Sequence, residues 1–86
     1  MSEFWRQAGD ILETAAAGRE PSQAAIMIDR SGGIRILDGA GWSPEALAAE
    51  FGAETIFQIR RNQSQVRVEG WNGAQHCSLR RNLHIF

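Results

Sequence analysis

The sequence predicts an α+β domain with the element order α-β-β-α-β-β-β, in which two helices pack on a five-stranded, mostly antiparallel sheet. Two segments carry apolar residues at helical spacing between capping residues, and the last third of the chain alternates apolar and polar residues as strands do. Two turn sequences, Ser31-Gly32-Gly33 and Asn72-Gly73, are typical of β-hairpins. A chain of 86 residues can bury one modest core, so residues 1–86 are expected to form a single domain.

The first expected helix begins after Ser2, a residue suited to cap a helix N-terminus. Apolar residues then recur with the helical period and form one stripe: Phe4, Ala8, Ile11, Leu12 and Ala15. Gly18 suits the position just after the helix, and Pro21 prevents the helix from resuming. Trp5 lies beside the stripe and is expected to be half-buried, where it seals the helix onto the sheet.

Residues 24–39 are expected to form a hairpin whose three-residue loop is Ser31-Gly32-Gly33. This loop sets Met27 opposite Leu37 on one face of the strand pair. The other face carries four isoleucines: Ile26, Ile28, Ile34 and Ile36, with Ile28 opposite Ile36. Because both faces are apolar, the strand pair should be covered on both sides, by helices or by a second subunit.

The second expected helix has the clearest local signals in the sequence. Ser43 suits the N-cap, Pro44 the first helical position and Gly52 the position just after the helix. Trp42 can pack on Leu47 as a hydrophobic staple. A helix of little more than two turns is not stable alone, so its apolar residues must pack against the sheet.

The remaining strands are expected at 55–61, 65–71 and 74–81. Asn72-Gly73 predicts a type I′ turn, because both residues tolerate positive φ. This turn sets Val68 opposite Cys77 and Trp71 opposite Ala74.

A turn at Asn62-Gln63 would join the first two of these strands and set Ile59 opposite Val66. Alternation along the strands then separates an apolar face from a polar face. The apolar face contains Phe57, Ile59, Val66, Val68, Cys77 and Leu79. The polar face contains Gln58, Arg60, Gln65, Arg67, Glu69, His76, Ser78 and Arg80.

This order of elements is similar to that of roadblock and profilin-like domains, in which helices lie on the faces of a sheet. The similarity covers most of the chain but involves no sequence motif, and the closing helix of many roadblock domains has no room here. The resemblance implies a dimerising or docking module.

Composition excludes several classes of function. The formal net charge of −1 gives no overall attraction for nucleic acid or anionic lipid. The nine basic residues are all arginine, which excludes chemistry that depends on lysine. No apolar run approaches the ~20 residues that a membrane helix needs. A single cysteine forms no internal disulfide, so we expect a soluble, cytoplasmic protein without membrane partners.

Candidate catalytic and metal-binding residues are few. His76 and Cys77 are adjacent on a strand and point to opposite faces, so they cannot act as a nucleophile–base pair. Cys77 is expected in the core, and His76 beside Glu69 across the strands. A metal site would need His76, Cys77 and His84, whose spacing matches no zinc pattern. We therefore expect no metal, no cofactor and no enzymatic activity.

The apolar first hairpin gives the main functional expectation. Met27 and Leu37 are candidate interaction residues, because two short helices supply little cover for both faces of that hairpin. Trp71, beside a tight turn, is a further candidate anchor unless the C-terminal tail of the same chain covers it. We expect a non-catalytic protein-interaction or homodimerisation module that binds another protein or a second copy of itself.

Three arginines on the polar face are the candidate anion-binding residues: Arg60, Arg67 and Arg80. They could attract phosphates or an acidic partner, and Arg61 and Arg81 flank them. However, the centre of this face lacks aromatic residues on which bases could stack, and it includes Glu69. Binding of nucleic acid or another polyanion is therefore the alternative function and is favoured less than protein interaction.

Overall fold

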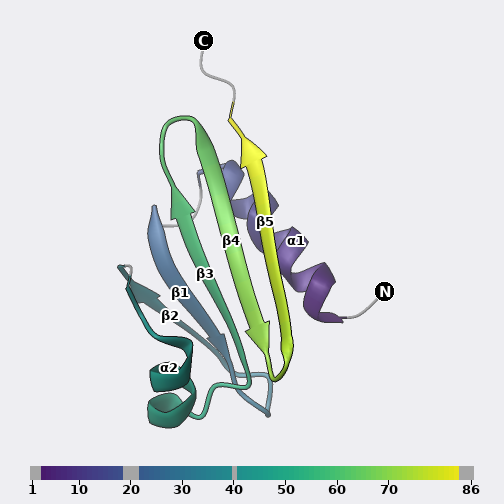
Figure 1. Ribbon diagram of the computed structural model, residues 1–86, viewed down its shortest axis with the longest axis vertical. Helices are drawn as coiled ribbons and strands as arrows, with labels where there is room; N and C mark the ends of the chain where they lie inside the picture. The colour runs from purple at the N-terminus through teal and green to yellow at the C-terminus, as the bar shows by residue number, and fades with distance from the viewer. Residues whose placement is uncertain (1–2, 19–21, 40, 84–86) are drawn as a thin grey trace.

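The computed structural model describes residues 3–18, 22–39 and 41–83, and it confirms the predicted α+β class and order of elements. The elements are α1 (Glu3–Ala16), β1 (Gln23–Ile28), β2 (Ile34–Asp38), α2 (Pro44–Phe51), β3 (Thr55–Arg61), β4 (Gln65–Asn72) and β5 (Gln75–Asn82). The five strands form one antiparallel sheet in the order β2-β1-β3-β4-β5 (Figure 1). The predicted helix cap at Ser2 and the break at Pro21 lie outside the described residues.

Helix α1 packs on one face of the sheet, which is called the inner face below. The predicted stripe is confirmed, because Phe4, Ala8 and Ala15 are buried and the other two members pack against the same core. Phe4 stacks on Phe57 of β3 with ring centroids 5.6 Å apart. The helix contacts β3, β4 and β5 and runs behind β4 and β5 in Figure 1. Trp5 keeps 44% of its surface exposed and meets the Phe4 ring edge-on.

Helix α2 covers a corner of the opposite, outer face of the sheet. Its predicted caps are confirmed: the Ser43 hydroxyl accepts from the backbone N–H of Ala46, and Gly52 ends the helix with φ 67°. Leu47 is 1% exposed and forms a second small core with residues of β1 and β3. The two helices therefore lie on opposite faces of one sheet.

The predicted register of the first hairpin is wrong by two residues. Ile28 pairs with Ile34, not with Ile36, so the loop begins one residue earlier than expected. The reason is Asp29, whose Oδ1 accepts from the backbone N–H groups of Ser31 and Gly33 at 2.9 and 2.8 Å. These bonds to the charged form also hold the pKa of Asp29 below its ordinary value, with the Ser31 hydroxyl making the largest contribution.

The registers of the other two hairpins are also wrong by two residues, but in the opposite direction, because each turn falls one residue later than expected. Val68 pairs with Leu79 and Trp71 with His76, so the tight turn falls at Gly73-Ala74, not at Asn72-Gly73. Only the glycine of this turn has positive φ, which fits a type II′ turn better than the expected type I′.

The β3–β4 hairpin turns one residue later than expected. Ile59 pairs with Val68, not with Val66. Asn62 Oδ1 accepts from the backbone N–H groups of Ser64 and Gln65, both at 2.9 Å, and this closes the turn. A displacement of two residues changes every cross-strand partner but leaves each side chain on its predicted face.

Candidate functional site

The corrected registers place three arginines in one row across the outer face. Arg60 of β3 pairs with Arg67 of β4, and Arg67 pairs with Arg80 of β5. All three are exposed. The row lies at the end of the sheet where β3 and β5 finish and β4 begins, uppermost in Figure 1, away from α2.

Few acidic groups lie near this row. Glu69 is one row further along the sheet, and its carboxylate lies 3.9 Å from Arg67 Nη2. The same carboxylate lies 3.5 Å from His76 Nε2, the contact expected from the sequence. Among the described residues, no carboxylate lies within ion-pair distance of Arg60 or Arg80.

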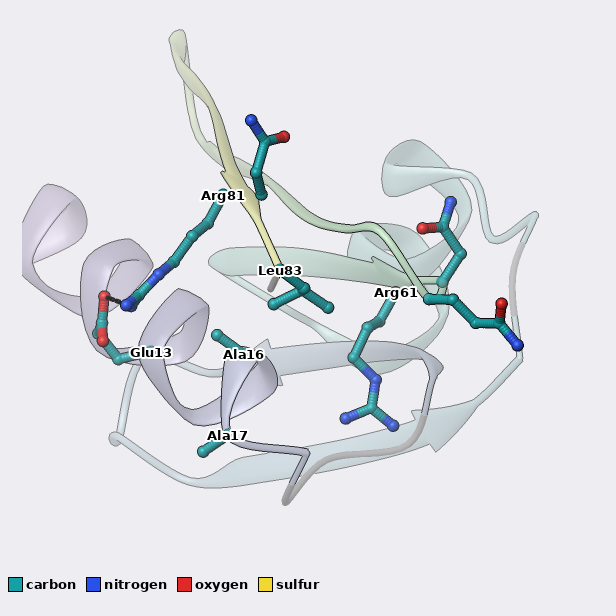
Figure 2. Close-up of a pocket in the computed structure, with 9 residues that line it drawn as sticks. Glu13, Ala16, Ala17, Arg61, Arg81 and Leu83 are labelled. Atoms are coloured by element: carbon teal, nitrogen blue, oxygen red, sulfur yellow. Dashed lines mark hydrogen bonds and ion pairs between the residues drawn. The ribbon is translucent and has the colours of Figure 1, made fainter. Parts of the chain in front are cut away.

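The two flanking arginines point to the inner face, where they meet α1 (Figure 2). Arg81 forms an ion pair with Glu13, and Arg61 Nη1 donates to the backbone carbonyl of Ala15 at 3.3 Å. A cation in this place is favourable, because the C-terminal end of a helix carries partial negative charge. Both arginines line a hollow of about 580 Å³ together with Glu13 and Leu83, and both are already held by α1.

A second surface lies on the inner face of β2, beyond the reach of α1. Ile34 is 68% exposed and Ile36 is 48% exposed, although both belong to the face on which α1 packs. Helix α1 packs on β3, β4 and β5, which are the strands furthest from β2 in the sheet. The two isoleucines are therefore the largest exposed aliphatic side chains among the described residues.

Strand β2 also has an open backbone edge, because β1 is its one partner in the described sheet. The Gly39 N–H donates to Gln23 O at 2.9 Å, and the Asp29 N–H donates to Gly33 O at 3.0 Å. In an antiparallel pair such bonds alternate, so the odd-numbered residues of β2 bond to β1. The outward N–H and C=O groups belong to Ile34, Ile36 and Asp38.

The predicted interaction residues Met27, Leu37 and Trp71 gather around α2. Met27 is 3% exposed, and Leu37 and Trp71 are half-buried against the same small core. The Trp71 indole stacks on the His76 imidazole with centroids 5.4 Å apart. Met27 therefore has no exposed surface for a partner, since α2 of the same chain occupies that position.

The apolar surface that remains open, Ile34 with Ile36, was not singled out from the sequence. The signal that could have revealed this surface is the width of the sheet compared with the width of one helix. A helix about 10 Å wide covers only two or three strands about 4.8 Å apart, so one helix leaves part of the inner face of a five-stranded sheet exposed. Strand order decides which strands stay uncovered, and the sequence does not give that order.

Cys77 lies in the core, as the strand alternation predicts. It is 2% exposed and packs in the cluster beneath α1. Burial raises the pKa of this thiol above its ordinary value. The described residues contain no group of three or more histidine, cysteine or acidic side chains placed to hold a metal ion, and His84 lies outside them.

Comparison with protein-family models, curated proteins and solved structures finds no match to this chain. Neither helix in the described part of the chain is long and apolar enough to cross a membrane.

Proposed function

We propose that this chain is a non-catalytic interaction module that forms a homodimer through β2. The observation that supports this proposal most strongly is the exposure of Ile34 and Ile36 on an edge strand whose backbone is unpaired. Burial of these side chains is favourable at about 25 cal/mol per Å² of apolar surface. Pairing of the strand edge would add backbone hydrogen bonds in the same interface.

The two edges of the sheet differ in a way that favours association at β2. Proteins protect exposed edges with charged residues, and β5 ends with Arg80 and Arg81, both exposed. β2 also carries two exposed charges, Arg35 on the outer face and Asp38 at the end of the inner face, but Ile34 and Ile36 leave the rest of its inner face apolar and exposed. The β2 edge is therefore the one suited to pair with another strand.

A second copy fits this edge in one register in particular. Antiparallel pairing about a two-fold axis at Ile36 sets Ile36 opposite its symmetry mate, and both residues have outward backbone groups. The two Ile36 side chains would then form the centre of an apolar cluster with Ile34, and Asp38 of each copy would lie opposite Ile34 of the other at its rim. A shift of the axis to residue 35 would set Arg35 opposite Arg35 of the second copy, which like-charge repulsion disfavours. A shift to residue 37 would set Ile36 opposite Asp38 and move the isoleucines of the two copies apart.

Two-fold pairing uses the same edge on both copies, so assembly stops at a dimer. The contact is small, because β2 has only five residues. Interfaces at the lower end of the size range are weak or transient, so we expect a dissociation constant on the order of micromolar or weaker.

Light scattering across a hundredfold range of concentration tests the proposal. We expect the mass to rise from monomer toward dimer, and Ile36→Asp to remain monomeric at every concentration with an unchanged circular dichroism spectrum. The control is Ser78→Asp, an exposed change on the outer face that should leave dimerisation intact. A wild-type monomer at all concentrations, or a dimer that survives Ile36→Asp, would contradict the proposal.

A further inference from the structure

The row of Arg60, Arg67 and Arg80 is electrostatically unfavourable on its own. Residues directly opposite on antiparallel strands have Cβ atoms about 4.5–5.5 Å apart, and like charges in such pairs are destabilising. Here two such pairs share one residue, Arg67. Among the described residues, the one carboxylate within ion-pair distance of the row is that of Glu69, which lies 3.9 Å from Arg67 and is shared with His76.

The other two arginines of these strands, Arg61 and Arg81, differ from Arg60 and Arg80 in having partners on α1. Arg61 and Arg81 are held by a helix carbonyl and by Glu13, so their positions have a structural explanation. Arg60 and Arg80 have no such ion-pair partner in the parts of the chain that the structure describes. An anionic ligand would supply the missing counter-charge.

The surroundings of the row are open and polar. Gln23 pairs with Arg60 at one end, and a hollow of about 260 Å³ is lined by Gln23, Gln65 and the arginines Arg60, Arg61 and Arg67. Side-chain amides of this kind can donate to and accept from polar ligand groups. Neither helix covers the row, because α1 lies on the inner face and α2 packs at the other end of the sheet (Figure 1).

We propose that the arginine row binds the phosphate backbone of a single-stranded nucleic acid. Guanidinium groups form paired, charge-assisted hydrogen bonds with phosphate oxygens, which a row of three can repeat along a backbone. The three arginines extend over roughly 10 Å across three adjacent strands. This length fits several successive phosphates of a backbone better than it fits one isolated ion.

A flat sheet face favours a single strand over a duplex, whose grooves admit a helix or a protruding ribbon. The same outer face carries the stacked Trp71–His76 pair, four residues along β4 and β5 from the row and so about 13 Å away. His76 is half exposed and presents an aromatic ring on which an unpaired base can stack. An acidic protein would also pair with the arginines, but it has no base to stack on the His76 ring.

Fluorescence anisotropy with a labelled oligothymidylate of about 12 nucleotides measures this binding directly. Neutralisation of three phosphates predicts a slope of about −2 for log K against log salt between about 50 and 200 mM NaCl. The variant Arg60→Gln/Arg80→Gln should reduce the slope to about −0.7. His76→Ala should weaken binding about fivefold or more without changing the slope.

A charge-matched control separates this site from the overall charge of the protein. Arg6→Gln/Arg30→Gln removes two exposed arginines remote from the row and should leave the slope near −2. Absence of binding at about 50 mM NaCl, or an equal loss in both double variants, would overturn the proposal. Equally tight binding of the matching duplex or of polyglutamate would also overturn it, because the ligand class would be wrong. The site lies on the face opposite Ile34 and Ile36, so these results are independent of dimerisation.

Discussion

Gly70 of β4 pairs with Phe57 of β3, and the Phe57 ring occupies the space where a side chain at position 70 would project. A Cβ atom on Gly70 would lie 2.7 Å from Cδ1 and Cε1 of that ring and 2.9 Å from Cys77 Sγ. Because Gly70 has no side chain, the Phe57 ring can lie over the backbone of β4 on the inner face of the sheet. Phe4 of α1 then stacks on Phe57, which attaches the helix to the sheet.

Gly70→Ala should therefore destabilise the protein. Overpacking of a filled core costs typically about 1–3 kcal/mol, and urea unfolding should show a loss of this size in the free energy of unfolding. Gly9→Ala is the control, because a Cβ atom there meets no other group within 4 Å and the residue lies within α1. It should raise stability by roughly 0.5–1 kcal/mol. Equal effects of the two substitutions would argue against the packing described at Gly70.

Cys77 should make stability fall at alkaline pH. Burial raises its pKa in the folded protein, so the unfolded chain loses the thiol proton first as pH rises. The contribution of this thiol to stability should therefore be constant below the unfolded pKa of about 8.5 and decline above it. The chain has no tyrosine or lysine, so Cys77 is the one side chain that titrates between pH 8 and about 11. The terminal amine also titrates near the lower end of this range.

Urea unfolding between about pH 7 and 10 measures this dependence, with Cys77→Ala as the comparison. The variant should be less stable at neutral pH, because a buried group is lost, but its stability should not decline with pH as the wild type does. The same slope in both proteins would mean that the thiol is not the group responsible. Ellman's reagent should react slowly with the folded wild-type protein and rapidly in urea.

Arg80→Gln should stabilise the protein, since it removes one of the two like-charge pairs in the row. The expected gain is roughly 0.2–1 kcal/mol at low ionic strength and smaller at 1 M salt, where the Debye length is about 3 Å. Urea unfolding at both salt concentrations provides the measurement. Arg30→Gln, at a residue whose side chain is 93% exposed, should show neither effect. A loss of stability in Arg80→Gln would mean that Arg80 makes a favourable contact instead.

Local signals in the sequence were sufficient to predict the elements and the faces of the strands. Ser43, Pro44 and Gly52 define α2 because capping depends on neighbours along the chain. Phe57 and Cys77 were placed on the inner face because alternation along a strand does not depend on its partner. These features are set by residues close together in sequence.

Cross-strand partners could not be predicted in the same way. Asn72 looked like a turn residue, but its amide donates to Thr55 Oγ1 at 2.6 Å and holds it within β4. That contact joins residues 17 apart and is visible only in the folded sheet. The arginine row depends on the same register: with the predicted turn, Arg67 would have faced Ser78 and not Arg80.

Hydrogen exchange of the β2 backbone tests the proposed dimer most directly. The N–H groups of Ile34, Ile36 and Asp38 point away from β1, so they should exchange rapidly in the monomer and become protected as the concentration rises. The N–H groups of Arg35 and Leu37, which face β1, should be protected at every concentration. Unprotected exchange at Ile34, Ile36 and Asp38 in concentrated samples would show that no second strand pairs with β2, and would contradict the account.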